Sequence, residues 1–310
     1  MNILSIPDLS LSKCLELVDK HFDCQAIVES SIDTDSVIDY YRQSDRGYRL
    51  FHSKDGAMHV ALNRDEAFTT EGYMGQVDLI SQRLEDLKVQ QVLEVGCGGG
   101  FNAKYLAERL KDCCFTGIDL SESHIRSACK ERKGFSNLSF AVGDYQDLQY
   151  EDNSYDTVFA VECLCQASNV RQALEEICRV LRPSGRLLVI DCFRSAPLDA
   201  YEDDLRRAIQ LVEKTMAVDS FAVLEEWLSM ADSIGLEIQE QTDLSAEISH
   251  NLERFYSLSR RFFKMPRAAR AFLKAFPPRL LQNSISGFLM PFTVGNGAHQ
   301  YFMLELAKKS

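Results

Sequence analysis

The sequence lacks the features that would place it in several specialised protein classes. No stretch approaches the run of about 18 apolar residues that a membrane-spanning helix needs. Lysine and arginine number 34 against 46 aspartate and glutamate, a net charge of −12, so the excess of basic residues typical of nucleic-acid-binding proteins is missing. Proline (7) and tryptophan (1) are scarce, and there are no repeats or low-complexity segments. What remains is an ordinary globular composition, 45% hydrophobic and 26% charged.

Cysteine is plentiful but shows no metal-binding spacing. None of the ten cysteines forms a C-x₂-C pair, and several fall in segments expected to be strands or helices, where a free thiol packs as a small apolar group. The N-terminus has neither a basic flank nor a long apolar segment, so no secretory signal is expected. These patterns predict a reduced, cytoplasmic protein without a metal site. A chain of 310 residues is long enough for one large domain, or one domain with an added lid.

The most informative segment is the glycine-rich stretch between a short apolar strand at 92–95 and a helix over 101–110. Glycines stand at positions 96, 98 and 100. Glycine allows a sharp turn and close approach of a ligand to the backbone, and the helix that follows presents unpaired N–H groups at its positive end. A nicotinamide-dependent dehydrogenase has the fingerprint Gly-x-Gly-x-x-Gly, but here the third glycine comes one position too early.

Strands and helices alternate after this loop, which predicts a parallel sheet. Asp119 ends the second strand, where an acid suits the two hydroxyls of a ribose. Asp144 follows the third strand, and Glu162 ends the fourth. A helix and a turn then lead to a fifth strand that ends at Asp191. The expected elements are strands at 115–120, 138–144, 155–162 and 186–191, and a helix at 169–181.

This series of motifs resembles the class I S-adenosylmethionine-dependent methyltransferases, strongly over roughly residues 90–195 and loosely outside them. The resemblance implies an α/β fold with a Rossmann-like, doubly wound, seven-stranded, mostly parallel sheet. It implies S-adenosyl-L-methionine as the cofactor. Carried over from the family, Glu94 and the backbone of the glycine loop hold the amino acid part, Asp119 binds the ribose and Asp144 meets the adenine amino group. The implied cofactor-binding residues are Glu94, Gly96, Cys97, Gly98, Asp119, Leu120, Asp144, Tyr145 and Val161.

The rest of the chain is expected to add helical parts to this core. Apolar spacing near 3.6 predicts helices over 12–29, 36–43 and 66–87, and two more within 197–233. The strands at 235–241 and 300–307 are separated by about 60 residues, far more than an ordinary connection. We therefore expect an N-terminal helical cap (1–88), a cofactor-binding α/β core (89–245), a helical lid inserted between the sixth and seventh strands (246–298), and the final strand (299–310).

A second resemblance concerns the acceptor. Tyr40-Tyr41, the Met-His pair that ends at His59, and Glu162 with Ala167 after the fourth strand are similar to elements of the sterol and tocopherol-type small-molecule C-methyltransferases. Those enzymes carry a histidine where this chain has Gln166. The substitution leaves the acid–base assignment open and argues against a literal sterol enzyme.

The resemblance and the chemistry together give these residues candidate roles. Methyl transfer to an alkene carbon leaves a carbocation, which needs a base and stabilising π-faces. Glu162 is the candidate base, unless it caps a helix or pairs with a backbone amide. Tyr40 and Tyr41 are the candidate π-faces. His59 either orients the acceptor or packs in the N-terminal part, and Gln166 is a candidate hydrogen-bond donor to the acceptor. Catalytic roles are thus assigned to Glu162, His59 and Tyr41.

The candidate lid is strongly basic. Residues 252–282 contain eight lysines or arginines and one acid. This excess favours an anionic acceptor group or peripheral contact with a lipid surface, with Arg260 and Arg261 as acceptor-binding residues. The alternative is a solvated helix face that balances an acidic body.

We therefore expect a methyltransferase acting on a small, largely apolar acceptor. Carbon methylation of an isoprenoid or other lipid is favoured, with a prenyl diphosphate among the candidates. Oxygen or nitrogen methylation of a natural-product scaffold, or a cyclase of this fold that binds the cofactor without transferring its methyl group, are the alternatives. Nucleic acid is not an expected partner, because the Asn/Asp-Pro-Pro-Tyr motif of base methyltransferases is absent after the fourth strand.

Overall fold

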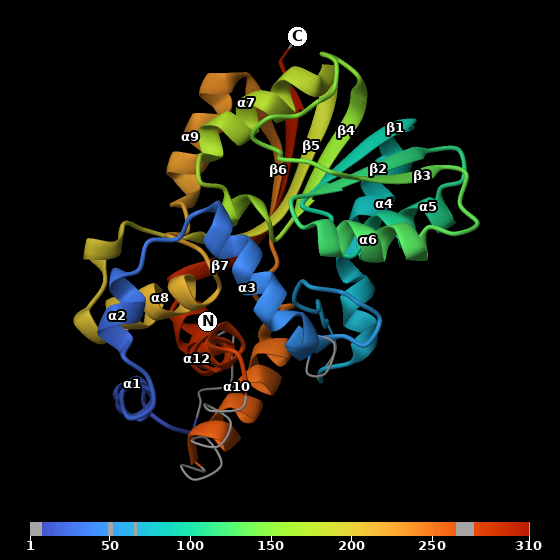
Figure 1. Ribbon diagram of the computed structural model, residues 1–310. Helices are drawn as coiled ribbons and strands as arrows, with labels where there is room; N and C mark the ends of the chain where they lie inside the picture. The colour runs from blue at the N-terminus through green and yellow to red at the C-terminus, as the bar shows by residue number, and fades with distance from the viewer. Residues whose placement is uncertain (1–7, 49–51, 65–66, 265–275, 310) are drawn as a thin grey trace.

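A computed structural model describes residues 8–48, 52–64, 67–264 and 276–309. It shows a twisted sheet flanked by helices, with a separate layer of helices across one end of the sheet (Figure 1). The first described helix lies in the helical layer, and the last described strand belongs to the sheet.

The sheet has seven strands in the order β3-β2-β1-β4-β5-β7-β6. Among the strands of the described residues, only β7 runs antiparallel to its neighbours, β5 and β6. The strand order reverses between β1 and β4, which makes a switch point where doubly wound sheets bind ligands at their carboxyl ends. The predicted seven-stranded, mostly parallel, doubly wound sheet is confirmed. The strands are β1 (Gln91–Val95), β2 (Cys114–Asp119), β3 (Leu138–Val142), β4 (Tyr155–Val161), β5 (Leu181–Arg194), β6 (Leu236–Asp243) and β7 (His299–Lys308).

Side chains alternate between the two faces of the sheet and form a separate core on each. In β1, Val92 packs with α4 (Gly75–Leu87) and α5 (Phe101–Arg109). Its neighbour Leu93 packs on the opposite face with α7 (Val170–Val180) and α9 (Leu224–Ile234). Helix α6 (Glu122–Glu131) packs on β2 and β3. Because both faces are covered, the central strands are apolar on both sides.

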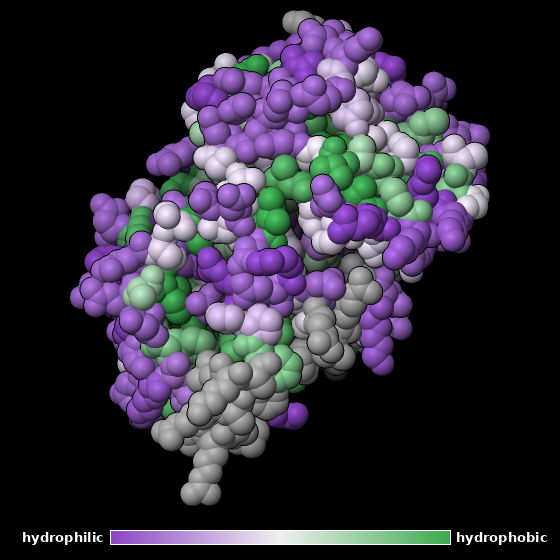
Figure 2. Space-filling view, in the orientation of Figure 1, coloured by the Kyte–Doolittle hydropathy of each residue, from purple (hydrophilic) through white to green (hydrophobic). Residues whose placement is uncertain are grey.

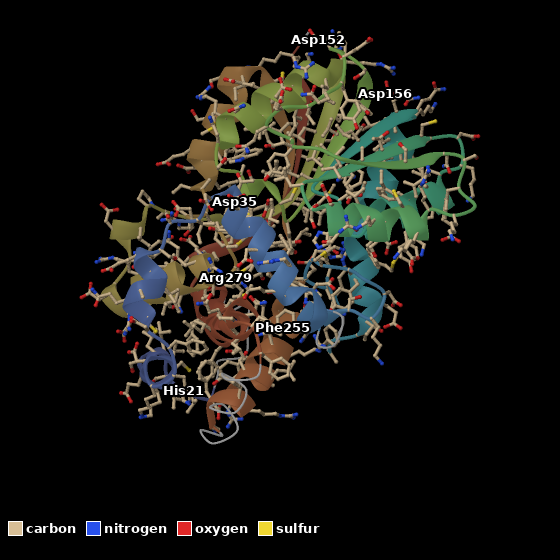
Figure 3. All side chains as sticks on the ribbon, in the orientation of Figure 1. His21, Asp35, Asp152, Asp156, Phe255 and Arg279 are labelled. Atoms are coloured by element: carbon tan, nitrogen blue, oxygen red, sulfur yellow. The ribbon has the colours of Figure 1, made fainter. Side chains whose placement is uncertain are left out.

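The helical layer has a third hydrophobic core of its own. It is built from α1, α2, α8, α10 and α12, and α3 packs on α12. Figure 3 shows Asp152 and Asp156, near the start of β4, at the end of the molecule opposite to His21, Phe255 and Arg279 of this layer. The helical layer therefore covers the carboxyl ends of the strands. Its helices are α1 (Leu11–Asp19), α2 (Cys24–Glu29), α3 (Thr34–Gly47), α8 (Asp203–Thr215), α10 (Ser249–Lys264) and α12 (Pro278–Gly295).

Two of the expected helices are divided in the structure. The stretch 12–29 forms α1 and α2, because the side chain of Asp23 accepts a hydrogen bond from the Ala26 N–H and starts a new helix. The helix expected over 66–87 is a 3₁₀ turn, η2 (Thr70–Met74), followed by α4. Further 3₁₀ turns are η3 (Leu164–Gln166) and η4 (Leu198–Ala200).

Helices α10 and α12 occupy most of the region 246–298 that separates β6 from β7. On the face shown in Figure 2, hydrophobic residues gather where the sheet meets the helical layer. Within the described ranges, no helix combines the length and the apolar character needed to cross a bilayer. The domain boundaries at 88, 245 and 298 stay a prediction.

Candidate active site

The loop after β1 adopts backbone conformations that favour glycine. Gly96 and Gly98 have φ values of +66° and +52°. A Cβ atom on Gly96 would lie 2.5 Å from the Cβ of Cys163, which follows β4. The N–H of Cys97 donates to the carbonyl of Ile118 at 2.8 Å and ties the loop to β2. The loop can therefore run close under a ligand only with glycine at these positions.

Asp119, at the end of β2, holds this loop in place. Its Oδ2 accepts a hydrogen bond from the Gly98 N–H at 2.9 Å, and its Oδ1 accepts one from the Ser121 N–H at 2.8 Å. Nδ1 of His124 lies 3.5 Å from Oδ1, and its ring packs edge-on against Tyr41. Ser121 and His124 were missed in the sequence analysis, because nothing in the motif distinguishes them from other residues at a helix start.

Glu94 lies beneath the loop. It is 2% exposed, and its carboxylate accepts hydrogen bonds from Asn102 Nδ2 and from the Ala103 N–H, both at 3.1 Å. Burial raises the pKa of this carboxyl to about 8. Glu94 thus reaches the ligand space through Asn102, which lines it.

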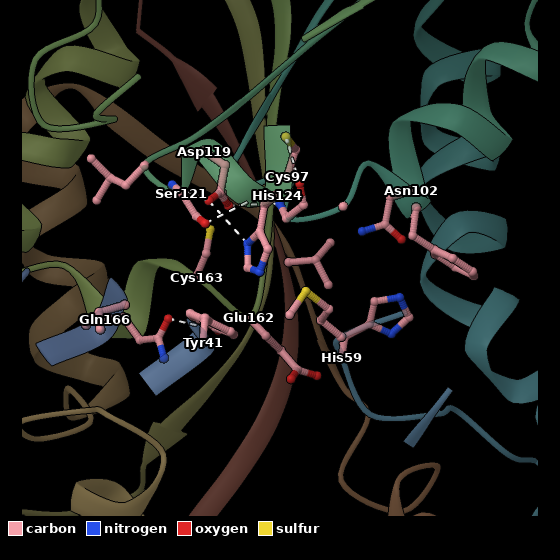
Figure 4. Close-up of a pocket in the computed structure, with 18 of the residues that line it drawn as sticks. Tyr41, His59, Cys97, Asn102, Asp119, Ser121, His124, Glu162, Cys163 and Gln166 are labelled. Atoms are coloured by element: carbon pink, nitrogen blue, oxygen red, sulfur yellow. Dashed lines mark hydrogen bonds and ion pairs between the residues drawn. The ribbon is translucent and has the colours of Figure 1, made fainter. Parts of the chain in front are cut away.

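A first cavity opens at the ends of β1, β2 and β4, beneath α3 (Figure 4). A carboxylate, exposed loop backbone and a tyrosine ring together suit the ribose, amino acid and adenine parts of S-adenosylmethionine. Asp144 is not in the lining; it stands next to Tyr145, and its Oδ1 accepts from the Gln146 N–H at 2.8 Å. The predicted residues that the structure does place in the lining are Gly96, Cys97, Gly98, Asp119, Leu120, Tyr145, Val161, Tyr41, His59, Glu162 and Gln166.

Glu162 stands at the end of β4 in a strained backbone conformation, with φ of +49°. Its N–H donates to the Ile190 carbonyl at 2.8 Å. Its Oε1 accepts hydrogen bonds from the Val60 N–H at 2.9 Å and from the Tyr301 hydroxyl at 2.7 Å. Among the described residues, none donates a hydrogen bond to Oε2. Burial raises the pKa of Glu162 to about 7, although both hydrogen bonds act to lower it.

A second cavity lies on the other side of Glu162. It shares Tyr41, Met58, Glu162 and Gln166 with the first cavity, so these residues form the boundary between them. Gln166 is held there, because its Oε1 accepts from the Tyr41 hydroxyl at 3.1 Å and its Nε2 donates to the Met216 carbonyl at 3.0 Å. Most other lining residues are apolar, among them Val60, Met216, Val218, Phe221, Ile248, Met290 and Val294.

The tyrosines that line the second cavity include one that was named from the sequence and one that was not. Tyr40 lines it, with its hydroxyl 2.9 Å from that of Tyr48, and its expected place beside the acceptor stays a prediction. Tyr301, the partner of Glu162, was missed. It belongs to an expected strand, but no local pattern shows that this strand lies beside β5.

His59 is a buried residue, and its expected acceptor-orienting role stays a prediction. It lines the first cavity and not the second, and its ring packs against Phe101 with centroids 5.6 Å apart. Burial lowers its pKa to about 4. The ring is therefore neutral near pH 7.

The structure corrects the placement of Arg260 and Arg261. Neither lines the cavities described here: Arg260 is ion-paired with Asp8, and Arg261 is exposed. The physical reason is the amphipathic pattern of α10, which buries Tyr256 and Phe263 in the helical layer and turns the two arginines outward. Three other basic residues of this segment, Arg267, Arg270 and Lys274, lie outside the described residues.

Comparison with known proteins agrees with this site. Residues 87–232 match a family model described as a methyltransferase domain. A phthiotriol/phenolphthiotriol dimycocerosates methyltransferase of Mycobacterium tuberculosis is 39% identical over 120 residues, which cover 39% of this chain and 44% of that protein. The sterol 24-C-methyltransferase erg6 of Aspergillus fumigatus is 32% identical over 161 residues, 50% of this chain and 42% of that protein. The chain thus aligns with less than half the length of these relatives.

A solved structure shows the same fold over nearly the whole chain. The cyclopropane synthase MmaA2 of Mycobacterium tuberculosis superposes with a TM-score of 0.73 at 14% identity, covering 90% of this chain and all of that one (100%). The methyltransferase-domain match and the shared fold agree with the predicted class, S-adenosylmethionine-dependent methyltransferase, and with S-adenosylmethionine as the cofactor. The matched residues 87–232 carry the glycine loop, Asp119 and Glu162.

Proposed function

We propose that this protein transfers the methyl group of S-adenosylmethionine to a carbon atom of a small, largely apolar, isoprenoid-type acceptor, with Glu162 as the base. The observation that carries the proposal is the position of Glu162 on the wall shared by the two cavities, with a pKa of about 7. A base works best when its pKa lies near the pH at which it operates.

The chemistry follows from this arrangement. Bound S-adenosylmethionine supplies an electrophilic methyl group. The π-electrons of an acceptor double bond form the new carbon–carbon bond, which leaves a positive charge on the neighbouring carbon. Tyr41, on the same wall, offers a π-face to this cation, and Glu162 removes the adjacent proton to restore the double bond. The proton ends on the carboxylate, and the donor leaves as neutral S-adenosylhomocysteine.

The lining of the second cavity argues against an anionic acceptor group. No lysine or arginine is among its lining residues within the described ranges, whereas a diphosphate calls for several cationic contacts. This favours a neutral isoprenoid or sterol-like lipid over a prenyl diphosphate. The relative named as a sterol 24-C-methyltransferase supports the same substrate class.

The experiment is incubation of the protein with methyl-labelled S-adenosylmethionine and a panel of sterols, polyprenyl lipids, prenyl diphosphates and phenols, with the products analysed by mass spectrometry and NMR. Label bound to carbon in a neutral lipid is the expected result. Label bound to oxygen or nitrogen would contradict carbon methylation and indicate an O- or N-methyltransferase instead. A rearranged, unlabelled product would indicate a cyclase that binds the cofactor without methyl transfer.

A further inference from the structure

Two buried polar atoms on the wall of the first cavity have no hydrogen-bond partner among the described residues. They are Nε2 of His59 and Oδ1 of Asn102. The two residues are only 4% and 6% exposed, so bulk water does not satisfy either atom. Their side chains are neighbours on this wall, as Figure 4 shows, and the nearby Asn102 side chain acts to raise the pKa of His59, although no hydrogen bond of normal geometry joins Nε2 and Oδ1. A buried polar atom without a partner costs free energy, so a pair of them facing a cavity points to a ligand.

The hydrogen bonds made by the other nitrogen of His59 and by the amide nitrogen of Asn102 show whether the ligand must donate or accept. Nδ1 of His59 lies 3.1 Å from the Val60 carbonyl, which can only accept, so Nδ1 carries the proton. In the neutral ring Nε2 is then an acceptor. Asn102 donates from Nδ2 to Oε1 of Glu94 at 3.1 Å, which leaves Oδ1 as an acceptor. Both free atoms therefore require a donor.

We propose that His59 and Asn102 bind the α-ammonium group of the methionine part of the cofactor and select for it. An ammonium group has three donors and no acceptor, so it can satisfy both atoms at once. A carboxylate at this place would face two acceptors and be repelled. The inference rests on S-adenosylmethionine as the cofactor, and it gives His59 a cofactor-positioning role in place of an acceptor-orienting one.

The test is calorimetric binding of S-adenosylhomocysteine and of its deaminated analogue, which lacks only the amino group. The wild-type protein is expected to bind S-adenosylhomocysteine about 10- to 100-fold more tightly, the range for hydrogen bonds to a charged group. His59→Phe keeps an aromatic ring against Phe101 but removes the acceptor. This variant should lose most of the preference, chiefly through weaker binding of S-adenosylhomocysteine.

A matched control comes from the same cavity. The hydroxyl of Tyr145 donates to the Cys163 carbonyl and not to the two free acceptors. Tyr145→Phe should therefore change the affinity for both ligands by a similar factor and keep the preference. Equal affinity of the wild type for both ligands, or a full preference retained in His59→Phe, would overturn the proposal and indicate that water fills this place. If the wild type bound neither ligand, the cofactor assignment itself would fail and this proposal with it.

Discussion

Glu162→Gln tests the proposed base with little disturbance of the structure. A glutamine oxygen can accept the same two hydrogen bonds, from the Val60 N–H and the Tyr301 hydroxyl, so the fold and the cavity shape should persist. What the variant loses is the ability to take a proton. General-base catalysis contributes roughly 10²- to 10⁴-fold, or about 2.7 to 5.5 kcal/mol of barrier, so turnover should fall by that factor.

The pH profile adds an independent signature. Burial places the pKa of Glu162 at about 7, so the wild-type rate should fall as the pH drops through 7 and the carboxylate becomes protonated. Glu162→Gln should lack this limb. The assay is transfer of labelled methyl groups to the best acceptor of the panel at saturating cofactor, from pH 5.5 to 9, with S-adenosylhomocysteine affinity measured in parallel. Full turnover in the variant would refute the role of base and leave Glu162 as a group that anchors Val60.

Three further changes follow from the same contacts. Tyr301→Phe removes a hydrogen bond that lowers the Glu162 pKa, so the acid limb of the rate profile should move to higher pH; an unmoved limb would contradict this. Asp119→Ala should weaken calorimetric binding of S-adenosylhomocysteine by about 1–3 kcal/mol, whereas Ala at the exposed Glu122 should have no effect. Because burial raises the folded-state pKa of Glu94 to about 8, the free energy of unfolding should decrease as pH rises from about 4.5 to 8. Glu94→Gln should make this decrease smaller, which is measured as a weaker dependence of the melting temperature on pH. An unchanged dependence on pH would show that Glu94 is not protonated in the fold.

The cofactor half of the site could be predicted because its determinants are local. The strand, the glycine loop and the next helix occupy consecutive residues, and Gly96 and Gly98 do adopt the positive φ values that only glycine adopts readily. Asp119 follows from the strand–helix repeat, since the carboxyl ends of parallel strands meet at one edge of the sheet. Each inference needs only residues within a few positions of one another, or the repetition of one strand–helix unit along the chain.

The surroundings of Glu162, which we propose as the acceptor side, depended on contacts between distant segments. Tyr301 reaches Glu162 only because β7 inserts between β5 and β6, and the N–H of Val60 reaches it from a loop about 100 positions earlier in the chain. Tyr301 was not expected from the sequence, whereas Arg260 was wrongly expected to bind the acceptor. Its charge suggested a binding role, but packing of the apolar face of α10 directs it to the surface. The sequence alone determined the sheet, the glycine loop and the class of cofactor, because periodicity and backbone preference act locally. Burial, and the shifts in pKa that it causes, arise only when distant segments exclude water together, so only the tertiary structure gives Glu162 the pKa of about 7 that suits the proposed base.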